Sequence, residues 1–142
     1  MTTPFDAALR IAERELDEVR TAIGAVVEEL DRIAMMQEAA DTALTRESTI
    51  AGGDPRLTSD RFFARAREIR EELKQQRAAR QLQLDELRAK AVEHYGQHTA
   101  VSDAVARFRS DAELEIARAE QAANDDIAAS RMPRRARRLA SA

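Results

Sequence analysis

One apolar stripe with a 3.5-residue spacing constrains the fold of this chain more than any other feature. Across the first third of the chain, apolar positions advance by four and three residues alternately, and Gln37 is the only polar residue among them. Because such a period is typical of a helix whose stripe faces another helix, the pattern predicts a helix over 4–46. Thr3 can cap it, and Asp6 lies three residues after that cap. The stripe comprises Phe5, Leu9, Ala12, Leu16, Val19, Ile23, Val26, Leu30, Ile33, Gln37, Ala40 and Leu44.

A turn signal and a second helix follow. Gly52-Gly53-Asp54-Pro55 is typical of a turn, and a proline disfavours helix for the residue before it, so a loop is predicted over 47–59. A second helix is predicted over 60–130, ended by Pro133. The stripe of this helix comprises Phe62, Ala66, Ile69, Leu73, Leu84, Leu87, Ala91, His94, His98, Val101, Val105, Phe108, Ala112, Ile116, Ala119, Ala123 and Ile127.

Two 11-residue steps interrupt the second stripe, one between Leu73 and Leu84 and one between Val105 and Ile116. Such insertions locally unwind a supercoil, so each step is interpreted as a slip of the helix–helix register. Residues 74–83 contain few apolar side chains. That stretch is therefore predicted to be helical with weak packing against its partner.

The fold class predicted is all-α, with two long helices forming an antiparallel coiled-coil hairpin over 1–130 and a basic tail over 131–142. At about 1.5 Å per residue, the second helix is the longer one. A hairpin folded near Gly53 puts Phe5 opposite Val101, so the stripe beyond about residue 102 lacks an intramolecular partner. An exposed apolar stripe of that length implies a binding partner.

Composition supports long helices over a globule with an active-site pocket. Charged residues make up 35% of the chain and aromatic residues 4%, a profile of coiled coils. Net charge alternates along the chain: −6 over 1–50, +3 over 51–90, −5 over 91–130 and +5 over 131–142. The chain has no cysteine and no 18-residue apolar run, so neither disulfides nor a membrane span is expected. We expect no catalytic residues, no cofactor and no enzymatic activity.

Two other features fit more than one interpretation. His94 and His98 have the spacing of a helical two-His metal pair, but no further histidine or cysteine accompanies them. We therefore expect these two histidines to be polar positions of the stripe that bind no metal. The five arginines after residue 130 fit a nucleic acid, an anionic lipid, an acidic protein patch or a solvated terminus. Because most of the chain is acidic, no nucleic-acid partner is expected.

The layout resembles the FliJ family of flagellar export proteins over nearly the whole chain. Leu9-Arg10-Ile11-Ala12-Glu13-Arg14-Glu15-Leu16-Asp17-Glu18 is similar to the family's opening helix. Thr58-Ser59-Asp60-Arg61-Phe62, with Ile69, Leu73 and Gln81-Leu82-Gln83-Leu84, is similar to the start of its second helix. Asp125-Asp126 and the basic stretch from Arg131 to Arg138 look like the family's end.

The resemblance implies a cytoplasmic stalk at the cytoplasmic face of the membrane near the flagellar base, peripheral to the membrane at most. The implied partners are the hexameric export ATPase, the export-gate membrane protein and export chaperones. The gate-contacting surface would comprise Ile69, Leu73, Gln76 and Arg80, although the family tends to have an apolar residue and a histidine at the last two positions. The surface for the ATPase ring would comprise Val105, Phe108, Ala112, Ile116, Arg131, Arg134 and Arg135.

A generic scaffold is the main alternative function. In that case the unpaired stripe of the second helix would pair with the same stripe of another copy. A weaker alternative is a nucleic-acid or membrane-surface binder led by the arginine tail.

Overall fold

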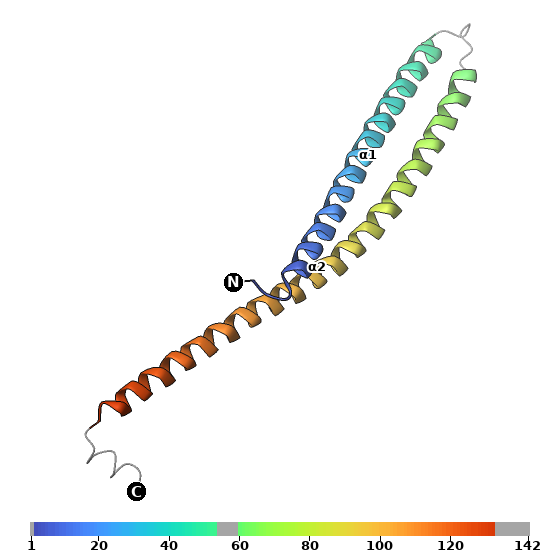
Figure 1. The fold of residues 1–142 in the computed structure, drawn as a ribbon. Coiled ribbons are helices and arrows are strands. Elements are labelled where there is room, and N and C mark those ends of the chain that lie inside the picture. Colours follow the sequence, from blue (N-terminus) through green and yellow to red (C-terminus); the bar gives the residue numbers. More distant parts are fainter. Residues whose placement is uncertain (1, 54–59, 133–142) are drawn as a thin grey trace. The chain divides into compact units, whose positions relative to one another are not determined.

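Two helices account for nearly all of the chain described by the computed structural model, which covers residues 2–53 and 60–132. Helix α1 spans Asp6–Gly53 and helix α2 spans Asp60–Ser130. The described residues contain no strand. The predicted all-α hairpin with a longer second helix is therefore confirmed (Figure 1).

The N-terminus of α1 is capped by hydrogen bonds between Thr3 and Asp6. The Thr3 hydroxyl oxygen accepts from the Phe5 backbone N–H at 3.3 Å and donates to Asp6 Oδ1 at 2.6 Å. The Thr3 backbone N–H donates to Asp6 Oδ2 at 2.9 Å. Such a cap satisfies N–H groups that a helix leaves without intrahelical partners, and it confirms the predicted cap at Thr3.

The end of α1 lies further along the chain than predicted. The helix continues past residue 46 to Gly53, and the Thr49 hydroxyl donates to the Thr45 carbonyl within it. Glycine weakens a helix without breaking it, whereas Pro55 restricts the residue before it. The predicted loop therefore began too early, because the helix continues through residues 47–52 and ends at Gly53.

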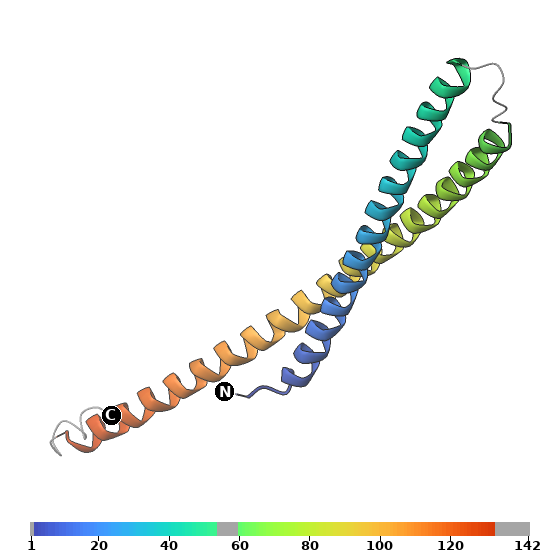
Figure 2. The same cartoon turned by 90° about the horizontal axis from the view of Figure 1, so that it is seen from above.

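Contacts divide the described chain into two units. The hairpin unit comprises residues 12–53 and 60–97, and the terminal unit comprises residues 2–11 and 98–132. In the hairpin unit, α1 and the first half of α2 lie side by side in both views (Figures 1 and 2). Its core consists of apolar side chains from the two predicted stripes. The buried ones are Ala12, Leu16, Val19, Val26, Ile33, Ala66, Leu73 and Leu84.

The terminal unit pairs residues 2–11 with α2. Phe5 packs edge-on against Phe108, with ring centroids 6.3 Å apart, and Arg109 Nη2 lies 3.9 Å from Asp6 Oδ1. Phe5 thus contacts a residue seven positions beyond Val101, its predicted partner. The midpoint of the connection between Gly53 and Asp60 lies three to four residues beyond the turn assumed. Since displacing a turn moves the facing residue twice as far, the longer α1 accounts for the shift.

The expectation that α2 lacks an intramolecular partner from residue 102 onward is therefore wrong. Val105 is only 4% exposed, and Phe108 contacts Phe5. From residue 106 to residue 132, however, no described residue is buried. The uncovered part of the stripe therefore begins after Val105, later than predicted.

Candidate partner-binding surfaces

The exposed stripe of α2, which we define as Ala112, Ile116, Ala119, Ala123 and Ile127, is the first candidate surface. Ile116 is 52% exposed and Ile127 is 49% exposed. The two isoleucines are 11 residues apart, which is close to three turns of a helix, so they share one face. A helix face that is apolar and open to solvent can bury that area only against another molecule.

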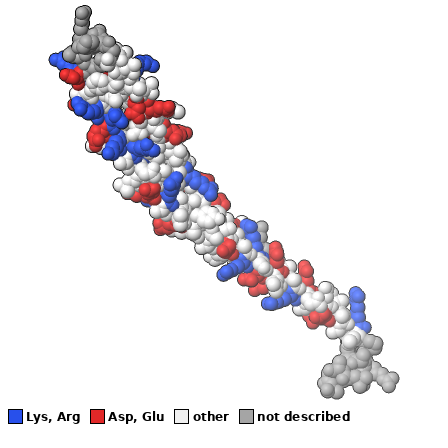
Figure 3. Space-filling model, turned by 180° about the vertical axis from the view of Figure 1, so that it is seen from behind, with Lys and Arg blue, Asp and Glu red and all other residues white. Residues whose placement is uncertain are grey.

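Acidic side chains accompany this exposed stripe. Residues 110–130 contain six acidic residues and a single basic one, Arg118. At helical spacing, Asp111 and Glu115 lie along one edge of the stripe and Glu113 along the other. On the face drawn in Figure 3, basic and acidic side chains are interspersed along the molecule rather than gathered into one basic surface. A partner for the stripe would therefore present an apolar ridge with basic edges.

Leu114 is a third large apolar residue in this part of α2, and it is 48% exposed. It lies two positions from Ile116, which on a helix puts it on nearly the opposite face. Leu114 is therefore exposed to a similar extent without belonging to the exposed stripe, which makes it a matched control.

The residues assigned to the ATPase ring by resemblance have different environments. Val105 is buried in the terminal unit, whereas Phe108 packs against Phe5 and is still 38% exposed. Ala112 and Ile116 belong to the exposed stripe, and Arg131 lies exposed in the turn after α2. Arg134 and Arg135, like most of the basic tail, lie outside the described residues.

The residues assigned to the export gate all lie on α2 in the hairpin unit. Leu73 is 6% exposed and belongs to the core, so a partner cannot reach its side chain without parting the helices. Ile69, Gln76 and Arg80 are exposed. Gln76 and Arg80 line a groove of about 380 Å³ between the helices, together with Glu29, Arg32, Ile33, Met36 and Ala79.

Arginines occupy the inter-helix seam between Leu73 and Leu84. Arg77 Nη1 donates to Gln37 Oε1 at 3.2 Å, and Arg80 forms an ion pair with Glu29. From Leu73, steps of four, three and four residues lead through these arginines to Leu84. Because the step from Ile69 to Leu73 is also four residues, two steps of four adjoin at Leu73, and the alternation of four and three is interrupted there as the 11-residue step predicted.

Sequence reasoning missed this polar seam because it followed apolar residues alone. Gln37 was visible as the polar residue of the first stripe, and Arg77 and Arg80 lie within the 11-residue step of the second. A search of the second helix for a polar residue that could pair with Gln37 would have identified Arg77. The expectation of weak packing was correct, since every residue from 74 to 83 is exposed.

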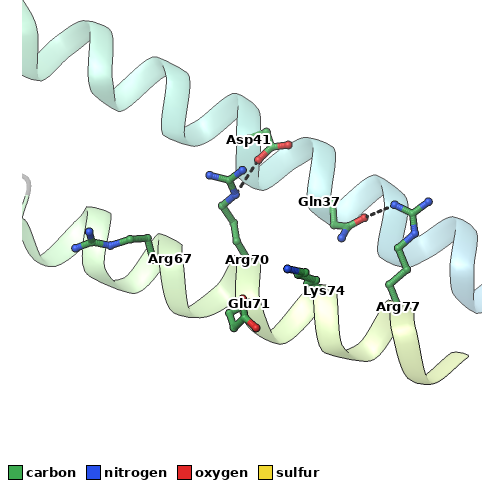
Figure 4. A pocket seen from close by; sticks show the side chains of 7 residues that line it. All are labelled: Gln37, Asp41, Arg67, Arg70, Glu71, Lys74 and Arg77. Carbon is green, nitrogen blue, oxygen red and sulfur yellow. Dashed lines mark hydrogen bonds and ion pairs between the residues drawn. The ribbon is translucent and has the colours of Figure 1, made fainter. Parts of the chain in front are cut away.

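A second groove opens beside this polar seam, on α2 residues that neither predicted surface includes. It has a volume of about 710 Å³. Arg70 Nε lies 3.2 Å from Asp41 Oδ1 across it. The groove is lined by Gln37, Asp41, Arg67, Arg70, Glu71, Lys74 and Arg77 (Figure 4).

His94, a predicted polar position of the stripe, lies against α1. Its Nδ1 atom is 3.4 Å from Glu15 Oε2, without the alignment of a hydrogen bond. Within residues 2–53 and 60–132, no three His, Asp or Glu side chains group as a metal site would require.

Neither described helix has an apolar stretch that could cross a membrane. The fold and the surfaces together define a helical hairpin protein with an uncovered, acid-edged helix face. Comparison of the chain with protein-family models, with curated proteins and with solved structures finds no match.

Proposed function

We propose that this protein is a stalk or adaptor of the flagellar type III export apparatus. It would act in the cytoplasm, at the membrane face near the flagellar base. Its helices would seat in the hexameric export ATPase and couple the ring to the export gate and to export chaperones. The protein would act by binding alone, with no catalytic step of its own.

The exposed stripe of α2 carries this proposal. A stalk must present an apolar helix face to its partner, and Ile116 and Ile127 lie on a face that the described part of the chain leaves open. Val105 supports that face from within the terminal unit because it is buried, whereas Phe108, which packs on Phe5 but is still 38% exposed, borders the exposed stripe. The unequal helices and the resemblance of the opening helix to flagellar export stalks support the same function.

The acidic edges of the exposed stripe favour a different protein over a second copy as its partner. Pairing two copies through this face would bring acidic edges together, and like charges at a helix–helix interface are destabilising. Basic edges on a partner would instead be complementary. The alternative of a self-associating scaffold is therefore less favourable than a hetero-complex.

The gate contact is proposed for the groove that contains Gln76 and Arg80. Met36 contributes an exposed apolar side chain there, and Ile69 is exposed on the same face of α2, seven residues before Gln76. Leu73 would act indirectly, by holding α2 against α1.

The decisive measurement is ATP hydrolysis by the purified export ATPase with and without this protein. Ile116→Asp combined with Ile127→Asp should abolish the stimulation, because each substitution puts a charge where apolar area is to be buried. Leu114→Asp should leave the stimulation intact. Circular dichroism should report the same helix content for all variants.

Two outcomes contradict the proposal. Full stimulation by the Ile116→Asp/Ile127→Asp variant would show that the exposed stripe does not meet the ATPase. Sedimentation showing a tight dimer that becomes monomeric in the same variant would assign the stripe to self-association instead.

A further inference from the structure

The groove that opens beside the polar seam has no role in the proposed function. It lies within the hairpin unit, between Asp41 on α1 and the face of α2 that contains Arg67, Arg70, Lys74 and Arg77. Along α1 it continues into a hollow of about 640 Å³ that shares Gln37, Asp41 and Arg77. Because no large apolar side chain fills the seam between Leu73 and Leu84, this part of the hairpin remains open to a ligand.

The lining of the groove is cationic. Four basic and two acidic side chains line it, which leaves a net charge of +2. Arg70 and Arg77 reach across to α1, where each engages one side chain through one nitrogen (Figure 4). The other guanidinium nitrogens of these arginines remain available as donors.

Arg67 and Lys74 are the two other cations of the groove. Neither forms an ion pair with another described residue. Glu71 lies between them in sequence, but its carboxylate stays over α2 in Figure 4. The two cations are seven residues apart, which is about 10 Å along a helix.

We propose that this groove binds an acidic peptide segment of a partner protein. Carboxylates three residues apart in an extended segment, or seven apart on a helix, would match the separation of Arg67 and Lys74. Arg70 and Arg77 would add donors between and beside these two positions. Arginine forks suit carboxylates because both groups are planar and can pair through two hydrogen bonds.

Other anions fit this groove less well. A single small anion would not fill a trough of this length. Asp41 and Glu71 would repel the continuous charge of a nucleic-acid backbone, and no aromatic side chain lines the groove to stack on bases. A peptide can place its carboxylates beside the cations and its neutral residues beside Asp41.

The test is binding of a fluorescein-labelled peptide of about ten residues, with a glutamate at every third position and neutral residues between, to the full chain, followed by anisotropy. Arg67→Glu combined with Lys74→Glu should weaken binding by about tenfold or more, since reversing the charges replaces attraction by repulsion. Arg67→Gln combined with Lys74→Gln should give a smaller loss in a fold that circular dichroism shows to be intact.

The matched control is Arg88→Glu combined with Lys90→Glu, which makes the same charge change on exposed residues of α2 outside the groove. This variant should bind the peptide within about twofold of the wild type, because exposed charges more than about 10 Å away are largely screened at physiological salt. Equal weakening by both charge reversals would overturn the proposal, as would undetectable binding by the wild type. Loss of binding to phosphatidylserine vesicles or inositol hexakisphosphate, with peptide binding unchanged, would also overturn it.

Discussion

Thr3 and Asp6 determine where α1 begins through three short-range hydrogen bonds. The pKa of the Asp6 carboxyl is lowered from its ordinary value of 3.8, mainly because the Thr3 hydroxyl donates to it and also because the Thr3 backbone N–H does. Burial opposes this shift and Arg109 adds to it. Since the carboxylate form makes the cap, the cap contributes stability above the unfolded-state pKa and loses it as pH falls through the lowered value.

The stability of the first helical turn should therefore depend on pH in the wild type, and Asp6→Asn should remove that dependence. In the wild type, protection of the Leu9 amide, which donates to the Phe5 carbonyl at 2.9 Å, should fall as the pH is lowered below about 4. In the variant, protection should be weaker at neutral pH and nearly constant on acidification. Hydrogen exchange measured by NMR makes the comparison.

Asp31→Asn is the control, because Asp31 is an exposed carboxylate far from the start of α1. Its acid dependence at Leu9 should match that of the wild type. An acid-dependent loss of protection that persists in Asp6→Asn would show that the cap is not the titrating element.

The pairing of α1 with α2 combines an apolar seam with a polar middle. Gln37 and Arg77 meet across the helices at 3.2 Å, between the buried residues Ile33 and Leu73. Partly exposed polar contacts of this kind contribute little stability, but they disfavour other registers in which their partners would be lost.

Replacing both members of this contact, with Gln37→Leu and Arg77→Leu, should stabilise the hairpin. The two leucines would extend the apolar seam, and burial of their side chains should raise the free energy of unfolding by about 1–3 kcal/mol. Urea denaturation followed by circular dichroism measures the change. Gln81→Leu, on an exposed position of α2, should leave the unfolding free energy unchanged within about 0.5 kcal/mol.

An unchanged or lowered stability in the double-leucine variant would mean that Arg77 does not occupy a seam position. The single variant Arg77→Leu should fall between the wild type and the double variant, because it leaves Gln37 without its cross-helix partner.

The sequence predicted the helices well where apolar residues recur at a regular spacing. The buried residues Leu16, Val26 and Ile33 follow the predicted stripe of α1, because its period alone identifies the face that packs. The end of α1 and the register of the pairing were predicted less well. Both depend on where the turn begins, and a displacement of a few residues there moves every facing pair.

The candidate surfaces were also predicted only in part. The exposed Ile116 was identified by its period, but the burial of Val105 depended on the length of α1, which the sequence pattern did not determine. The cationic groove was missed altogether. It results from two helices meeting, and Asp41 and Arg70 are not close in sequence.

At the scale of the whole molecule, the unequal lengths of α1 and α2 determine how much of α2 can pack against α1. The hairpin unit has an apolar core, and the terminal unit has residues 2–11 packed on α2 around Val105. Beyond these contacts α2 continues to Ser130 without a buried residue. Its last turns therefore rely on backbone hydrogen bonds and on pairs close in sequence, such as Gln121 with Asp125 at 3.0 Å.

This final stretch is helical because it prolongs a helix that has already started. Nucleation is the costly step of helix formation, and short isolated helices are marginal in water. A synthetic peptide of residues 110–132 should be largely unfolded by circular dichroism, whereas the same residues remain helical in the intact chain; a strongly helical peptide would contradict this. The hairpin thus starts the helix that this final stretch continues, and a proteolytic cut upstream would turn an ordered helical stretch into a disordered peptide.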